Sequence, residues 1–164
     1  MTAMLEGRET ELTVKANRPT PIVRDAQTLL RRGIEALEHD SFEEANVLLK
    51  QAAELAPKSP DVFLALGIAQ TRLLLIPEAV TALETAIGLA PDNFYPHFRL
   101  GELYMRVGVP TKAREELDRA MKLSENTEQR RMVREMLAID ARRAAKRAWR
   151  PDFSRLIRNR GTPQ

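Results

Sequence analysis

Glycine recurs every 34 residues in the middle of this chain, at Gly33, Gly67 and Gly101. Two alanine columns and one leucine column keep the same interval, and proline closes the first two of three units. These columns are Ala45, Ala79 and Ala113; Ala52, Ala86 and Ala120; Leu49, Leu83 and Leu117; and Pro57 and Pro91, with Glu125 in the third place. A period of this length indicates a solenoid of stacked units, each of which buries its apolar face against its neighbours.

Each unit is predicted to be a pair of amphipathic helices joined by a short turn. In the first unit, apolar residues recur at helical spacing from Leu29 to Leu37, and Ser41 with Glu44 forms a capping-box pattern before a second apolar stripe. Small residues at fixed heights allow paired helices to approach to about 8–10 Å. We therefore expect an all-α fold. The other helix starts and turns are marked by Ser59-Pro60, Pro77, Asn93, Gly108 and Pro110.

The combined pattern resembles the tetratricopeptide repeat (TPR) family. The family's Leu-Gly pair is present as Leu66-Gly67 and Leu100-Gly101, its tyrosine as Tyr104, and its closing proline as Pro57 and Pro91. The sequence departs from the family at Arg32, before Gly33, and at Leu29, Phe63 and His97, where tryptophan is common. The resemblance covers 102 of the 164 residues and implies a helical-hairpin solenoid of three TPR units, at 26–59, 60–93 and 94–127.

The two ends differ from the repeats. Residues 1–25 are predicted to be a mobile N-terminal arm, and residues 150–164 a basic tail. Residues 128–149 are predicted to form a helix that caps the apolar face of the last unit, because solenoids need a polar terminal cover and Glu135 stands where a fourth unit needs glycine. The apolar stripe of this helix is Val133, Leu137, Ala141, Ala144 and Ala148.

The resemblance also implies a binding surface, because the first helix of each TPR unit lines a concave groove. On this chain the groove positions hold Leu30, Arg31, Ile34 and Glu38; Leu64, Ala65, Ile68 and Arg72; and Tyr95, Phe98, Arg99, Glu102, Met105 and Arg106. An apolar surface with an arginine rim favours a peptide with apolar anchors and acidic groups. The alternative for each residue is packing between neighbouring units.

Two TPR subtypes were compared with these positions. Chaperone-tail binders of the family hold a carboxylate with lysine, asparagine and arginine, but the corresponding places here are Leu30, Ile34, Ala65, Tyr95 and Arg99. Only Arg99 fits, so the sequence excludes that clamp. Type III secretion chaperones resemble the chain in length and repeat number, but the basic tail and the close match to the general repeat pattern argue against that assignment.

Charge is distributed unevenly along the chain. Residues 130–160 carry a net charge of +8, whereas the whole chain carries +3. This suggests a second hypothesis, association with a polyanion such as RNA, the ribosome or an anionic membrane. The alternatives are a merely solvated helix face or pairing with the acidic repeats. The basic side chains concerned are Arg142, Arg143, Lys146, Arg147 and Arg150, with Trp149 and Phe153 nearby.

Catalytic and metal chemistry find little support. The chain has no cysteine, and its two histidines, His39 and His97, are far apart in sequence and form no metal-ligand pair. No phosphate-binding glycine loop or serine elbow is present. No apolar run approaches a membrane span and no signal segment is evident, so a cytoplasmic location is the default expectation.

We therefore expect a non-enzymatic adaptor or chaperone-like scaffold that needs no cofactor or metal and binds a protein or peptide partner. A further hypothesis is self-association, in which one apolar-containing end of the chain occupies the groove of its own or a neighbouring copy.

Overall fold

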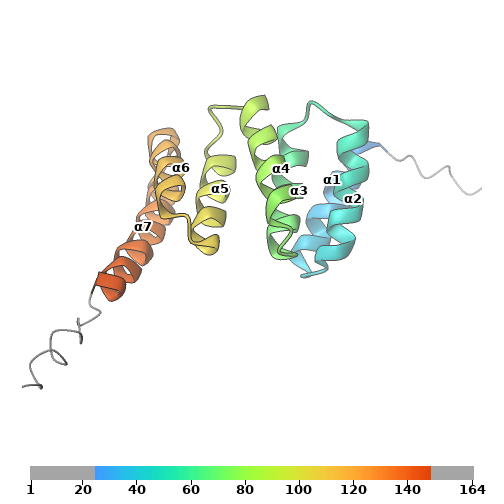
Figure 1. Cartoon of the computed structure of the whole chain (residues 1–164). Coiled ribbons are helices and arrows are strands. Elements are labelled where there is room, and N and C mark those ends of the chain that lie inside the picture. The colour runs from blue at the N-terminus through green and yellow to red at the C-terminus, as the bar shows by residue number, and fades with distance from the viewer. Residues whose placement is uncertain (1–24, 149–164) are drawn as a thin grey trace, which may run out of the picture.

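The computed structural model describes residues 25–148, which form seven helices and no strand in this range (Figure 1). The predicted all-α solenoid of TPR type is confirmed. The predictions for the arm before Asp25, for Trp149 and for the tail lie outside the described residues. The helices are α1 (Ala26–Glu38), α2 (Phe42–Leu55), α3 (Pro60–Arg72), α4 (Ile76–Leu89), α5 (Phe94–Val107), α6 (Pro110–Leu123) and α7 (Thr127–Ala148).

Glycine sets the distance between the two helices of each unit. A Cβ atom added at Gly33, Gly67 or Gly101 would lie 2.6, 2.7 or 2.8 Å from the Cγ atom of Leu49, Leu83 or Leu117, respectively. These distances are shorter than any normal carbon–carbon contact. The close crossing that the small-residue columns predicted is therefore present in all three units, with the leucine column packed against the glycine column.

The turn inside each helical pair has the same backbone form. The N–H groups of Ser41, Leu75 and Val109 donate to carbonyl oxygens five residues earlier, at 2.8, 2.9 and 2.9 Å, as in a Schellman turn. The residue before each of these donors has a positive φ, of 56° at Asp40, 61° at Leu74 and 79° at Gly108.

The caps of the helices are partly those that the sequence predicted. The Asn93 side chain accepts a hydrogen bond from the Tyr95 N–H at 3.0 Å, as expected for the start of α5. The predicted capping box at Ser41 is wrong, because the Ser41 side chain makes no capping hydrogen bond. The Schellman turn holds the Ser41 backbone at a ψ of 66°, outside the extended conformation that an N-cap side chain needs.

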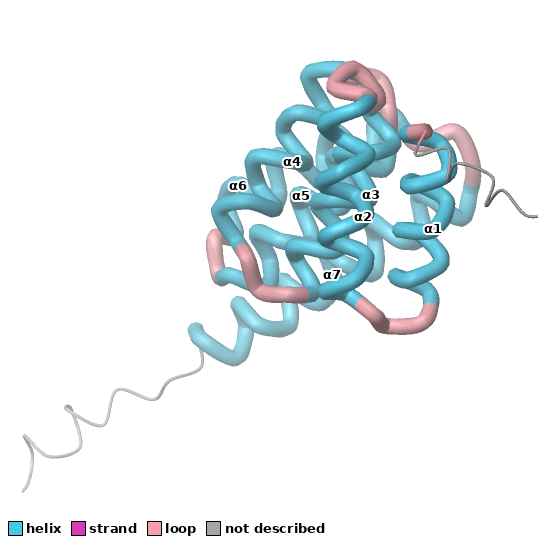
Figure 2. Tube along the Cα trace, turned by 90° about the vertical axis from the view of Figure 1, so that its right-hand side faces the viewer, coloured by secondary structure: helices cyan, strands magenta, loops and turns pink. Residues whose placement is uncertain are grey.

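The helices form two layers. Besides contacts between consecutive helices, α1 contacts α3, α3 contacts α5 and α5 contacts α7, whereas α2, α4 and α6 make no contacts with one another within residues 25–148. The odd-numbered helices therefore line the inner side of the curve and the even-numbered helices the outer side. Figure 2 looks along the solenoid from its α1–α2 end and shows successive pairs behind one another, joined by short loops.

Helix α7 occupies the place that the first helix of a fourth unit would take. Val133 is completely buried in a core cluster with Phe98, Leu103 and Leu117, and Leu137 packs against this cluster. The predicted stripe does not continue to Ala141, which is exposed, and the side chains of Ala144 and Ala148 lie outside the description. No helix within residues 25–148 is both long and apolar enough to span a membrane.

Candidate functional site

Five apolar side chains of the inner-layer helices are partly or fully exposed and are called the apolar band: Leu30, Ile34, Leu64, Ile68 and Tyr95. Of the residues that the sequence placed in the groove, Ile34 and Tyr95 are exposed, and Leu30, Leu64 and Ile68 are half-buried. They come from α1, α3 and α5, three of the four helices of the inner layer. Each of the three units thus contributes at least one apolar side chain that presents part of its surface to solvent.

Two other predicted groove residues lie in the core. Phe98 is 4% exposed and Met105 is 5% exposed, and both belong to one buried cluster. Phe98 stacks on Phe94 with a centroid distance of 5.6 Å, while Leu64 packs against the same cluster. Their contribution is packing between units, which was the alternative interpretation of these positions.

The cause of this burial is α7, which the groove prediction did not include. Met132 and Met136 of α7 pack against the cluster that contains Phe98 and Met105. They stand 34 residues after Phe98 and Glu102, so the repeat register alone assigns them to the inner layer. Ile139 follows on the same helix and is exposed. The concave side thus has a fourth, methionine-containing helix.

The three groove arginines have different environments. Arg72 pairs with Asp40 at 3.2 Å and lies over the Phe42 ring at 4.2 Å, so it is tied to the first turn. Arg99 pairs with Glu102 at 2.8 Å. Arg106 is exposed in the last turn of α5. Arg99 and Arg106 therefore lie beside the apolar band in the third unit, whereas Arg72 is held toward the first. The remaining predicted members are Arg31 and Glu38, which are exposed, and Ala65, which is buried.

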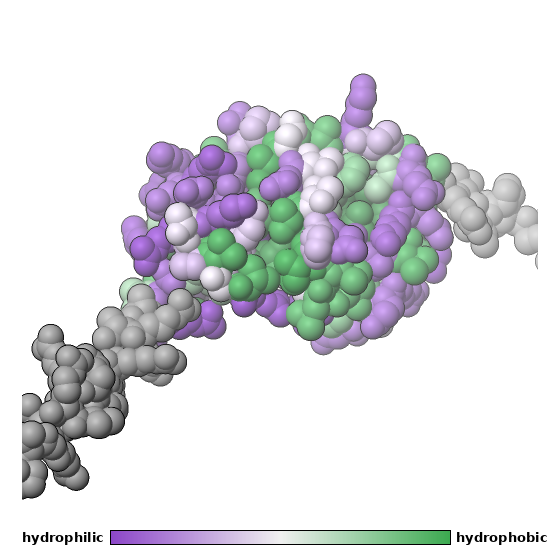
Figure 3. Space-filling model, viewed as in Figure 1, coloured by the Kyte–Doolittle hydropathy of each residue, from purple (hydrophilic) through white to green (hydrophobic). Residues whose placement is uncertain are grey.

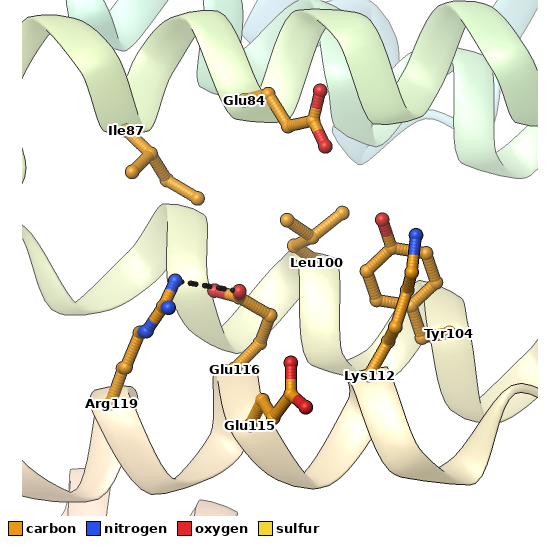
Figure 4. A pocket seen from close by; sticks show the side chains of 8 residues that line it. All are labelled: Glu84, Ile87, Leu100, Tyr104, Lys112, Glu115, Glu116 and Arg119. Carbon is orange, nitrogen blue, oxygen red and sulfur yellow. Dashed lines mark hydrogen bonds and ion pairs between the residues drawn. The ribbon is translucent and has the colours of Figure 1, made fainter.

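Two hollows lie on the outer layer, where the sequence analysis placed no site. The third-unit hollow, of about 230 Å³, is bordered by α4 and α6 with α5 as its floor (Figure 4). Leu100 and Tyr104 form the floor, and the rim carries charged side chains. These are Glu84 from α4 and Lys112, Glu115, Glu116 and Arg119 from α6. Burial raises the pKa of the Tyr104 phenol, and the carboxylates of Glu84 and Glu116 act in the same direction.

The second-unit hollow has the same place in the repeat and a volume of about 400 Å³. Six of its eight lining residues stand 34 positions before residues of the third-unit hollow, with Gln70 in place of Tyr104 and Ala82 in place of Glu116. The side-chain oxygen of Gln70 is buried and has no hydrogen-bond partner among the described residues. The two hollows therefore differ in chemistry although they share a backbone frame.

His97 is a buried structural residue beside the third-unit hollow. Its Nδ1 lies 2.7 Å from Glu116 Oε2, and its Nε2 lies 3.1 Å from the Pro91 carbonyl oxygen. Glu116 also accepts a hydrogen bond from Arg119 at 2.9 Å. Both ring nitrogens therefore lie within hydrogen-bond distance of an acceptor oxygen. The histidine links α5 to α6 and to the residues after the end of α4.

Only part of the predicted basic surface can be placed. Arg142 and Arg143 are exposed on α7, and Arg143 donates to the Met105 carbonyl oxygen at 3.4 Å. The side chains of Lys146, Arg147 and Arg150 lie outside the description. No group of histidine or acidic side chains suited to a metal ion occurs in the described part of the chain.

These features define a class of protein: a short α-solenoid with an open apolar band on its inner side.

The sequence of this chain matches no protein-family model and no curated protein. Solved structures do share the fold. The TPR2B domain of yeast Sti1, in a complex with pHsp70, has a TM-score of 0.68 at 18% identity and covers 72% of this chain and 97% of that one. The chain therefore has the tetratricopeptide-repeat fold, as the sequence resemblance predicted.

Two further structures support this assignment. The type III secretion translocator chaperone SycD of Yersinia enterocolitica has a TM-score of 0.67 at 20% identity, over 72% of this chain and 93% of that one. The first TPR of Spaghetti (RPAP3), bound to the HSP90 peptide SRMEEVD, has a TM-score of 0.63 at 18% identity, over 72% and 94%. At these identities the likeness defines the fold alone.

Proposed function

We propose that this protein is a non-enzymatic interaction scaffold whose concave side binds a peptide segment of a partner protein. The observation that carries the proposal is that Leu30, Ile34, Leu64, Ile68 and Tyr95, which come from the inner helices of all three units, are partly or fully exposed apolar side chains. The solved structures of the same fold include a domain bound to an HSP90 peptide and a translocator chaperone, which supports a role in protein binding.

The chemistry of the band indicates the kind of peptide. Aliphatic and tyrosine side chains favour apolar anchors, and Arg99 and Arg106 add positive charge at the third unit. We therefore expect an extended or helical segment with at least two apolar anchors and an acidic group directed toward α5. The helices hold the band in place before binding, so the ordering cost falls mainly on the peptide.

A peptide-array screen followed by titration in solution tests the proposal. Selected peptides are titrated against the full chain and against Ile34→Asp and Ile68→Asp variants. Loss of one aliphatic contact and burial of a carboxylate are expected to weaken binding by about 2 kcal/mol, or about 30-fold.

Val47→Asp is the matched control, because Val47 is an exposed aliphatic residue of the outer helix α2. Its effect on peptide affinity is expected to be small. Equal weakening by the inner and outer variants, with unchanged helicity, would show that peptides do not use the concave band.

A further inference from the structure

The turn between α3 and α4 carries a leucine in a backbone conformation that favours glycine. Asp40, Leu74 and Gly108 occupy the same place in the three turns, and each has a positive φ. Glycine adopts this conformation without penalty and aspartate tolerates it, but a branched aliphatic side chain is strained there. Leu74 is also 69% exposed, so burial of its side chain does not offset the strain. An exposed, strained leucine is the kind of feature that points to a function outside the fold.

Leu74 belongs to a wider apolar edge. All three intra-unit turns and the C-terminal end of α7 lie on one side of the solenoid, at the bottom of Figure 1. In the third turn Val107 and Val109 are exposed, and Ile139 is exposed on α7 one turn before Arg143. Figure 3, viewed from the same direction, shows hydrophobic surface reaching the lower border of the molecule. We call Leu74, Val107, Val109 and Ile139 the turn edge.

Positive charge lies beside the turn edge. Arg106 and Arg142 are exposed, and Arg143 is placed at the end of α5 by its contact with the Met105 carbonyl oxygen. The nearest acidic groups of α7 and the first turn are already paired, Asp140 with Arg114 at 2.6 Å and Asp40 with Arg72 at 3.2 Å. Glu38 and Glu78 lie at the first and second turns, so the excess of positive charge is at the α5–α7 side.

We propose that the turn edge docks on the surface of an anionic lipid bilayer. Its aliphatic side chains are spread over two turns, the end of α5 and α7, and belong to neither of the two hollows, whereas a protein partner would need a matching pocket for each. A lipid bilayer deforms around separate side chains of this kind. A small number of aliphatic groups binds a membrane only weakly, so a second attraction is needed. Arg106, Arg142 and Arg143 supply it by binding lipid phosphates.

Vesicle co-sedimentation of the full chain tests this inference. The probes are vesicles of phosphatidylcholine alone and of phosphatidylcholine with phosphatidylglycerol. Binding is expected only to the anionic vesicles, and Leu74→Gly is expected to lower the partition coefficient about tenfold, because it removes the largest anchor. The same substitution relieves the backbone strain, so the melting temperature is expected to stay equal or rise. This combination separates loss of the anchor from loss of the fold.

Two controls make the test specific. Leu55→Ser removes a leucine that is 54% exposed at the end of α2, away from the turn edge, and is expected to leave vesicle binding unchanged. Arg106→Glu with Arg142→Glu is expected to abolish the preference for anionic vesicles, whereas Lys50→Glu with Lys58→Glu, which makes the same change in net charge, is expected to reduce it much less.

The proposal is overturned by either of two results. One is vesicle binding that Leu74→Gly leaves unchanged, which would assign the interaction to the rest of the basic region. The other is absence of vesicle binding together with a Leu74-dependent dimer in sedimentation, which would make the turn edge a contact between two copies.

Discussion

The close approach of the helices in each unit predicts opposite effects for one substitution at two glycines. Gly67 lies inside α3, where an added Cβ would stand 2.7 Å from Leu83 Cγ and 2.8 Å from Leu83 Cδ2. Gly88 lies in α4, where an added Cβ would meet nothing within 4 Å. Both glycines are helical, so alanine improves the intrinsic preference at both by up to about 1 kcal/mol. The space around each added Cβ atom therefore decides whether the substitution stabilises or destabilises the fold.

The magnitude at Gly67 follows from packing. Contacts below 3 Å must lengthen to about 3.5 Å or more, and Leu83 is completely buried, so its side chain has no free space to enter. Overpacking of this kind costs about 1–3 kcal/mol, which exceeds the gain in helix propensity. We expect Gly67→Ala to destabilise the fold by about 1 kcal/mol and Gly88→Ala to stabilise it by about 0.5 kcal/mol.

Urea denaturation of the two single variants measures both effects, and a double-mutant cycle with Leu83→Ala identifies the cause. Leu83→Ala alone is expected to cost about 2–5 kcal/mol. In that background Gly67→Ala should change sign and become stabilising, because the clashing atoms are gone. Equal stabilisation by Gly67→Ala and Gly88→Ala in the original background would refute the argument from close approach.

Two further predictions concern polar contacts. His97→Phe and Glu116→Ala are each expected to lower the free energy of unfolding by about 2–4 kcal/mol. The double variant introduces the residues found at these places in the second unit, and its loss should be at least about 1 kcal/mol smaller than the sum of the single losses. Additive losses in denaturation would show that the pair is not coupled. Hydrogen bonds from Thr28, chiefly from its backbone N–H, hold the pKa of Asp25 below its usual value. The resulting stabilisation of α1 is present above the pKa of the unfolded chain and lost as pH falls through the folded pKa, so the protection factors of the first turn of α1, corrected for the intrinsic exchange rate, should fall in acid. Asp25→Asn should remove that acid dependence; an unchanged acid response in the variant would assign it to another group.

The repeat could be predicted from sequence because its spacing is set by backbone geometry. Gly67 requires Leu83 at one fixed offset, and the same requirement recurs in each unit, so three weak signals reinforce one another. The turns were less predictable in detail. Ser41 and Glu44 fit the capping-box pattern, but the backbone bond from Ser41 to the Ala36 carbonyl oxygen governs the local conformation.

The candidate groove was predictable in outline only. The inner position of Ile34 and Tyr95 follows from the 34-residue register. The exposure of a residue at such a position depends on which side chains of the neighbouring helix pack against it. Phe98 and Met105 have groove positions in the register and are nevertheless buried, because Met132 and Met136 of α7 pack against their cluster. The residues of α7 that pack there could not be predicted from the family pattern, because α7 lacks the repeating glycine and lies after the three predicted units.

The core is uneven along the solenoid, and this has a consequence for recognition. Every aromatic residue of the buried clusters, Phe94, Phe98 and Tyr104, belongs to the third unit, whereas alanine, leucine and valine alone fill the clusters of the first two. In a linear array, each unit opens according to its own packing and that of its nearest neighbour. The first unit should therefore open locally more often than the third. A peptide that crosses the whole inner side would contact a third unit that rarely opens and a first unit that opens more often. Its binding would therefore slow hydrogen exchange most in α1 and α2.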